Sequence, residues 1–150
     1  MQPLSILVAD DVAEIQALVR GWLVQLGHKV TCASSGTEAA RMLGKQRFDL
    51  LITDVLMPDG DGLGLIGKFK AAEPAARILA ISGGSKHLPA GLCIKFAAGF
   101  GAHAVLGKPF NRQQLLDAIG MALRSDEEES PLLPHRLRSS PTKSDQRSKS

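Results

Sequence analysis

The chain has 150 residues, of which 44% are hydrophobic and 22% are charged, a composition typical of one soluble globular domain and not of a fibrous or disordered protein. Because no apolar run approaches the roughly 20 residues that cross a bilayer, and acidic Asp10 follows the amino terminus too soon for a signal peptide, we expect a cytoplasmic protein without a membrane span. Two cysteines are too few for a disulfide framework or a zinc site. A net charge of only +3, with five Phe, one Trp and no Tyr, argues against a basic groove that stacks the bases of single-stranded nucleic acid.

Short apolar runs recur along the first four fifths of the chain. Their length and their continuous apolar character are typical of parallel strands that are covered on both faces. The second run is more polar and β-branched than the others, as expected for a strand at the edge of a sheet. The five predicted strands are residues 5–9, 29–33, 50–53, 77–81 and 104–106.

Helical patterns fill the intervals between these runs. Apolar residues at three- and four-residue spacing predict helices over 12–26, 63–69 and 111–123, and a further helix begins near Ser35. Another helix, the fourth in chain order, is expected between residues 88 and 100, where proline and glycine obscure its extent. Three segments resemble capping boxes, in which side chain and backbone bond reciprocally at a helix start: Asp11–Glu14, Ser35–Glu38 and Asn111–Gln114. The strict alternation of strands and helices predicts a doubly wound α/β domain with a five-stranded parallel sheet and five helices.

The composition changes sharply after Arg124. Residues 125–150 contain seven Ser, three Pro and ten charged residues, and such a segment buries too little apolar surface to offset the entropy of ordering it. We therefore expect a folded domain over 1–124 and a disordered, charged, Ser/Pro-rich tail over 125–150. The alternative is a tail that docks on a partner or on the acidic site of its own domain.

Polar side chains follow four of the five predicted strands. They are Asp10 and Asp11 after the first strand, Asp54 after the third, Ser82 after the fourth, and Lys108 with Pro109 after the fifth. The carboxyl ends of parallel strands meet at one edge of the sheet, so we expect these residues to form one exposed rim. Three carboxylates that repel one another favour a hard cation such as Mg²⁺. Lys108 and Ser82 suit phosphoryl oxygens, and an aspartate there could form an aspartyl phosphate.

At these positions the chain resembles the receiver domain of two-component response regulators. The resemblance covers about residues 4–124. It rests on Asp10-Asp11, Asp54-Val55-Leu56-Met57-Pro58-Asp59-Gly60-Asp61-Gly62, Ser82 and Lys108-Pro109-Phe110. It implies the flavodoxin-like receiver fold with strand order 2-1-3-4-5, here as a stand-alone receiver of the chemotaxis or phosphorelay type, with no DNA-binding domain.

The resemblance also implies a function. Asp54 would accept a phosphoryl group from a histidine kinase or a histidine phosphotransfer protein in a Mg²⁺-dependent reaction. The domain would then switch the binding of an unknown downstream protein, acting as a signalling module and not as an enzyme. The implied Mg²⁺ ligands are Asp10, Asp11, Asp54 and the backbone carbonyl of Leu56; Ser82 and Lys108 would bind the phosphoryl oxygens; Met57, Pro58, Gly62 and Pro109 would shape the loops.

One departure and two alternatives accompany this interpretation. Val105 stands three residues before Lys108, where the family usually has Tyr or Phe, so aromatic switching cannot operate in its usual form. A pseudo-receiver that binds a partner without being phosphorylated is one alternative, and the intact acidic set argues against it. A phosphatase with an aspartyl nucleophile is the other; it would need an Asp-x-Asp pattern on the first strand, where Asp10 and Asp11 are adjacent.

Overall fold

A computed structural model describes residues 2–57, 62–83, 95, 98–99 and 101–124. The predicted tail (125–150), Pro58 and most of the predicted fourth helix lie outside the described residues. In the described part of the chain, no helix has both the length and the apolar character needed to cross a membrane.

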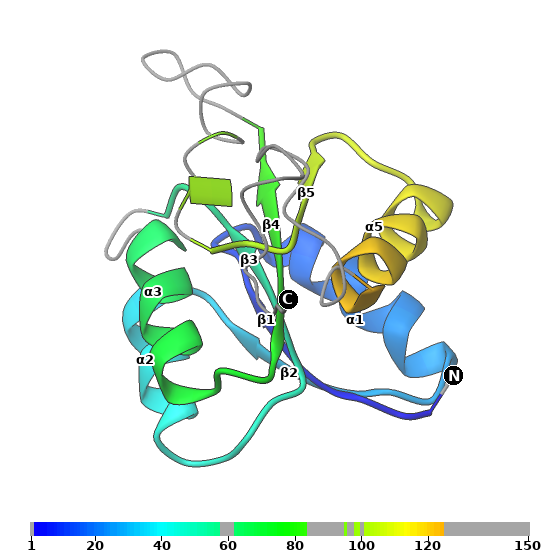
Figure 1. The fold of residues 1–150 in the computed structure, drawn as a ribbon. Helices are drawn as coiled ribbons and strands as arrows, with labels where there is room; N and C mark the ends of the chain where they lie inside the picture. Colours follow the sequence, from blue (N-terminus) through cyan, green and yellow to red (C-terminus); the bar gives the residue numbers. More distant parts are fainter. Residues whose placement is uncertain (1, 58–61, 84–94, 96–97, 100, 125–150) are drawn as a thin grey trace, which may run out of the picture.

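From residue 5 to residue 82 strands and helices alternate as predicted (Figure 1), and the segment between the fourth and fifth strands lies mostly outside the described residues. All strand pairs are parallel, and the strand order is β2-β1-β3-β4-β5, which confirms the doubly wound sheet with the more polar β2 at one edge. The elements are β1 (Ser5–Ala9), α1 (Ala13–Gln25), β2 (Lys29–Ala33), α2 (Gly36–Leu43), β3 (Leu50–Asp54), α3 (Gly62–Ala72), β4 (Arg77–Ser82), β5 (Ala104–Gly107) and α5 (Arg112–Arg124).

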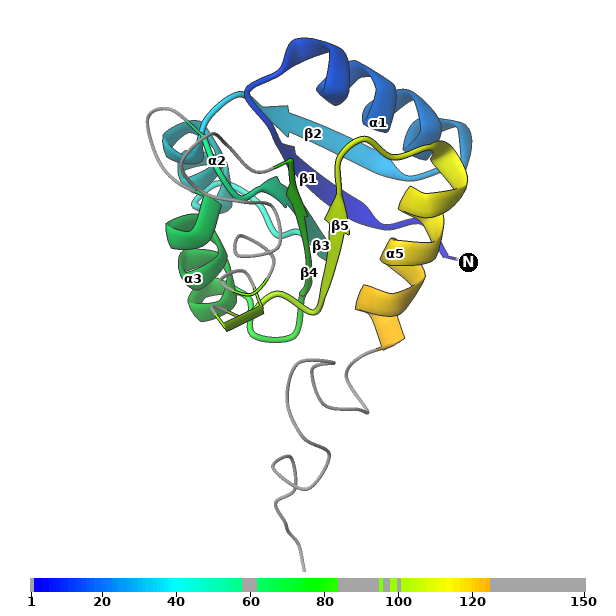
Figure 2. The ribbon, with the colours of Figure 1, turned by 90° about the horizontal axis from the view of Figure 1, so that it is seen from above.

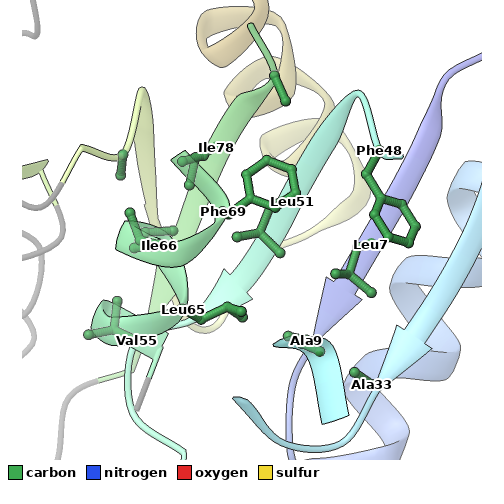
Figure 3. Packing of buried hydrophobic residues seen from close by; sticks show 14 of the residues in the cluster. Leu7, Ala9, Ala33, Phe48, Leu51, Val55, Leu65, Ile66, Phe69 and Ile78 are labelled. Carbon is green, nitrogen blue, oxygen red and sulfur yellow. The ribbon is translucent and has the colours of Figure 1, made fainter. Parts of the chain in front are cut away.

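Helices cover both faces of the sheet: α1 and α5 lie on one side, and α2 and α3 lie on the other (Figures 1 and 2). Successive strand residues point to opposite faces, so each strand contributes to two cores. In β1, Leu7 packs in the core under α2 and α3, whereas Ile6 packs in the core under α1 and α5. Figure 3 shows the first core, where α3 places Ile66 and Phe69 over the sheet. Burial on both faces explains why the strands read as continuous apolar runs.

The start of α1 differs from the prediction. Val12, and not Asp11, is the N-cap residue, and it makes no side-chain cap bond. Instead, the Oδ1 atom of Asp10 accepts a hydrogen bond from the N–H of Val12 at 2.9 Å. The capping box predicted at Asp11 is therefore wrong, because the helix begins one residue later than that box requires. Asp11 stays exposed at the carboxyl edge of the sheet.

The other two predicted helix starts have side-chain caps. At α5, the Oδ1 atom of Asn111 accepts from the N–H of Gln114 at 2.8 Å, and the Oε1 atom of Gln114 accepts from the N–H of Asn111 at 2.9 Å. This is the predicted capping box. At α2, Ser35 Oγ accepts from the N–H of Glu38 at 3.0 Å, but the Glu38 carboxylate accepts from the N–H of Ser34 at 2.7 Å. The bond from the Glu38 side chain back to the main chain is thus made at Ser34, one residue before the N-cap residue Ser35.

The sheet register brings the polar strand ends together. Asp54 is the last residue of β3 and pairs with Ile81, while Ser82 is the last residue of β4 and pairs with Gly107. Asp10 follows the end of β1, and Lys108 follows the end of β5. Residues more than 90 positions apart in the sequence therefore meet at one edge.

Candidate functional site

Three carboxylates lie together at the carboxyl edge of the sheet. One oxygen from each of Asp10, Asp11 and Asp54 lies within 4.8 Å of the other two. The expectation of an exposed rim is wrong for two of them, because Asp10 is 2% and Asp54 is 7% exposed. Asp54 ends β3 and Asp10 directly follows β1, and both strands lie in the interior of the sheet, whereas Asp11 stands one residue farther out. The cluster thus combines two buried acids with one that solvent reaches.

Lys108 places a positive charge between the two buried acids. Its Nζ atom lies 2.9 Å from Asp54 Oδ2 and 3.1 Å from Asp10 Oδ2. The backbone N–H of Lys108 donates to the Ser82 carbonyl at 3.0 Å, and a Cβ atom on Gly83 would lie 3.4 Å from the Lys108 side chain. Burial alone lowers the Lys108 pKa, but the hydrogen bond and charge of Asp54, together with Asp10, outweigh it and raise the pKa. The lysine is therefore a fixed cation.

Lys108 does not fully balance the charge of Asp10. Burial raises the pKa of Asp10, and the Val12 N–H and Lys108 offset this effect only in part. Among the described residues, Asp10 Oδ2 is a buried oxygen without a hydrogen-bond donor, although the Lys108 ammonium forms an ion pair with it at 3.1 Å. A buried carboxylate oxygen that lacks a donor, beside two further carboxylates, is a fitting ligand for a hard divalent cation.

The Asp54 carboxylate is held in one orientation. Its Oδ1 atom accepts from the N–H of Leu56 at 3.1 Å, and its Oδ2 atom accepts from Lys108 at 2.9 Å. Behind it, the N–H of Gly62 donates to the Val55 carbonyl at 2.9 Å. A Cβ atom on Gly62 would collide with the Asp54 carbonyl oxygen. The first residue of α3 must therefore be glycine for the helix to begin this close to Asp54.

The remaining predicted site residues surround this centre. Ser82 is buried at the end of β4, Leu56 is half-buried, and Pro109 is exposed directly after Lys108 with a cis peptide bond between them. Met57 is buried in the core that Figure 3 shows. The structure thus gathers every described residue of the predicted set at or next to one edge of the sheet.

No sequence pattern indicates a role for Gln16. This half-buried side chain on α1 donates to the Asp10 carbonyl at 2.6 Å and to the Ala33 carbonyl at 3.0 Å. A single glutamine in an amphipathic helix is ordinarily a solvent-facing residue. Only the packing of α1 against the loops after β1 and β2 shows where its amide lies.

Comparison with known proteins identifies the family. The family model described as the response regulator receiver domain matches residues 6–120. The DNA-binding transcriptional regulator NtrC of Azospirillum brasilense is 36% identical over 126 residues, which are 84% of this chain and 25% of that protein. The chain thus spans about a quarter of the length of this relative.

Solved structures agree with the sequence comparison. The chemotaxis response regulator CheY4 of Vibrio cholerae has a TM-score of 0.72 and 27% identity, with 81% of this chain and 100% of that chain covered. NtrX from Brucella abortus has a TM-score of 0.74 and 26% identity, over 84% of this chain and 28% of that chain. These matches show that the chain belongs to the response regulator receiver domain family.

Proposed function

We propose that the chain is a phosphoryl-accepting signalling switch with Asp54 as the acceptor. The observation that carries this proposal is the Asp54 carboxylate, buried at a strand end, bonded to Lys108 at 2.9 Å and clustered with two further carboxylates within 4.8 Å. A carboxylate oxygen of Asp54 attacks the phosphorus atom of a phosphohistidine. The phosphorus–nitrogen bond breaks, a phosphorus–oxygen bond forms, and the histidine nitrogen takes up a proton.

The acidic cluster fits Mg²⁺, as the buried Asp10 Oδ2 without a donor indicates. Asp10, Asp11, Asp54 and the backbone carbonyl of Leu56 would hold the ion. When bound, Mg²⁺ offsets the repulsion between the carboxylates and stabilises negative charge on the phosphoryl oxygens.

The chain's own residues supply the other parts of the switch. Leu56 and Lys108 orient the Asp54 carboxylate before transfer. Once Asp54 carries the phosphoryl group, the Lys108 ammonium and the Ser82 hydroxyl bond its oxygens, so the carboxyl ends of β4 and β5 shift. Val105 is half-buried against the core under α2 and α3. The movement of the strand ends therefore reaches the surface without an aromatic side chain at position 105. The readout is altered binding of a downstream protein.

The phosphoryl donor in this proposal is a histidine kinase or a histidine phosphotransfer protein. Residues 1–124 form the receiver unit, and residues 125–150 form a tail that phosphoryl transfer does not need. The protein acts in the cytoplasm and performs no catalysis on a substrate of its own.

Incubation with acetyl phosphate and Mg²⁺, followed by intact mass measurement, tests the proposal. We expect the wild type to gain the mass of one phosphoryl group and to gain nothing in EDTA. Asp54→Asn keeps the shape but removes the nucleophilic charge, so it should fold and remain unlabelled. Asp117→Asn makes the same change at an exposed position on α5 and should label like the wild type. A folded wild type that never labels would favour the pseudo-receiver, and full labelling of Asp54→Asn would exclude Asp54 as the acceptor.

A further inference from the structure

Gln16 contacts the acidic site from the side of α1. Its Nε2 atom lies 2.6 Å from the Asp10 carbonyl oxygen, 3.0 Å from the Ala33 carbonyl oxygen and 3.2 Å from Ser34 Oγ. Carbonyl oxygens only accept hydrogen bonds, so the atom that faces them is the NH₂ group and not the amide oxygen. The side chain therefore joins α1 to the loops that follow β1 and β2.

The Asp10 carbonyl is the oxygen of the peptide bond between Asp10 and Asp11. β1 ends at Ala9, where its register with β2 also ends at Ala33. The Asp10 N–H still donates to the Ala33 carbonyl at 3.0 Å, and Gln16 supplies the donor for the Asp10 carbonyl. The Asp10 backbone is thus tied to the end of β2 through its N–H group and to α1 through its carbonyl.

The orientation of this peptide plane decides where the two carboxylates point. Rotation of the Asp10–Asp11 peptide would move one side chain relative to the other, because both Cα atoms lie at its ends. The Val12 N–H holds Asp10 Oδ1 at 2.9 Å, but Asp11 is exposed and depends on its backbone for its direction. The contact from Gln16 therefore fixes the arrangement in which the three carboxylates lie within 4.8 Å of one another.

We propose that Gln16 is a positioning residue for the divalent-cation site, acting through the Asp10–Asp11 peptide and not as a ligand. This inference rests on the Mg²⁺ binding of the proposed function. Groups that orient metal ligands in this way contribute about 10-fold or more to metal affinity. Loss of the amide should therefore weaken cation binding while the domain stays folded.

The test measures cation binding directly, with Mn²⁺ as the probe and the electron paramagnetic resonance signal of free Mn²⁺ as the readout. Gln16→Met keeps an unbranched side chain with good helix propensity but removes the donor. Gln25→Met makes the same change at the exposed end of α1 and serves as the matched control. Gln16→Asn keeps an amide on a stem that is one methylene shorter, and it replaces Gln16→Met if that variant does not fold.

We expect the Mn²⁺ Kd to rise about 10-fold in Gln16→Met and to stay unchanged in Gln25→Met. Labelling by acetyl phosphate should fall at subsaturating Mg²⁺ and recover at saturating Mg²⁺, a split that a loss of folding stability would not produce. An unchanged Kd in folded Gln16→Met, with a wild type that binds Mn²⁺, overturns the inference alone. A wild type that binds no Mn²⁺ overturns the proposed cation site and this inference with it.

Discussion

Lys108 is the residue on which the charge balance of the site depends. Its side chain is 20% exposed, and the side chains of its two partners, Asp10 and Asp54, are 3% and 9% exposed. Breaking an ion pair that is largely buried leaves a carboxylate without compensation, at a cost of about 3 kcal/mol. The buried position of Asp10 and Asp54 makes this lysine important for stability as well as for signalling.

Lys108→Met should therefore lower the free energy of unfolding by about 3 kcal/mol at neutral pH without metal, because two buried carboxylates then repel each other. Mg²⁺ should restore part of the loss, since the cation replaces the missing charge. Urea unfolding with and without Mg²⁺ measures both effects, and Lys45→Met, in an exposed loop, is the control. Equal stability of Lys108→Met and the wild type in EDTA would contradict this account.

His28 has an unexpected structural role in the turn between α1 and β2. It is 6% exposed, and its Nδ1 atom accepts a hydrogen bond from the N–H of Leu4 at 3.0 Å. An Nδ1 atom that accepts carries no proton, and burial lowers the pKa of His28 below its ordinary value of 6.5. The folded protein thus holds this histidine neutral.

This lowered pKa makes stability depend on pH. Below about pH 6.5 the unfolded chain binds a proton at His28 that the folded chain binds only at lower pH, so the free energy of unfolding should fall as the pH falls from 6.5. His28→Asn keeps a side-chain acceptor but does not titrate. Chemical unfolding at a series of pH values from 8 to 5 should show a shallower decline in His28→Asn. Parallel curves for the two proteins would show that His28 makes no contribution.

At the scale of elements, the start of α3 controls the shape of the acceptor loop. Gly62 opens the helix against the Asp54 carbonyl, and the same helix contains Gly67, where a Cβ atom would meet nothing within 4 Å. The two glycines thus share an element and differ in their surroundings, so one of them is a matched control for the other.

Gly62→Ala should lower the free energy of unfolding by about 1–3 kcal/mol, because the helix start has to move away from Asp54. It should also slow labelling of Asp54. Gly67→Ala should instead raise stability by up to about 1 kcal/mol, since alanine is the better helix former. Thermal unfolding and acetyl phosphate labelling check both variants. Similar stability changes of the same sign in the two variants would mean that the close approach to Asp54 is not what requires glycine at position 62.

At the scale of the whole molecule, α5 is tied to the sheet at its far end. Arg77, the first residue of β4, donates from Nε to the Ala122 carbonyl at 2.9 Å, and Leu115 and Ile119 are buried in the core under α1 and α5. This contact lies at the opposite edge of the sheet from the acidic cluster. The domain therefore needs the chain through the last turn of α5.

A chain truncated after Arg124 should unfold cooperatively with a Tm close to that of the full chain, and it should label at a similar rate, because every described contact of the site and both cores is retained. A second truncation after Asp117 should unfold at a much lower temperature, since it removes Ile119 and the Ala122 carbonyl. Differential scanning calorimetry and mass measurement give the two readouts. Lost labelling in the first truncation would show that residues 125–150 contribute to the site.

Much of the fold could be predicted from local patterns. The strands over 5–9 and 29–33 have the predicted bounds, and the other three extend by a single residue at their carboxyl ends. Apolar runs and helical spacing are properties of neighbouring residues, so they are visible without a structure. Asp10, Asp54, Ser82 and Lys108 could be assigned to one edge for a similar reason, because parallel strands with helical crossovers all end on the same side.

Only the tertiary structure decided the details that depend on contacts between distant segments. Asp10 and Asp11 are chemically identical neighbours, and which of them becomes buried depends on the exit of the chain from β1 between β2 and β3. The burial of Asp54, the neutral His28 and the reach of Gln16 to the Asp10 carbonyl likewise depend on loops that meet only after folding. A sequence pattern shows which face of an element is apolar; it does not show which polar atoms lie within about 3 Å of each other, the distance at which hydrogen bonds form.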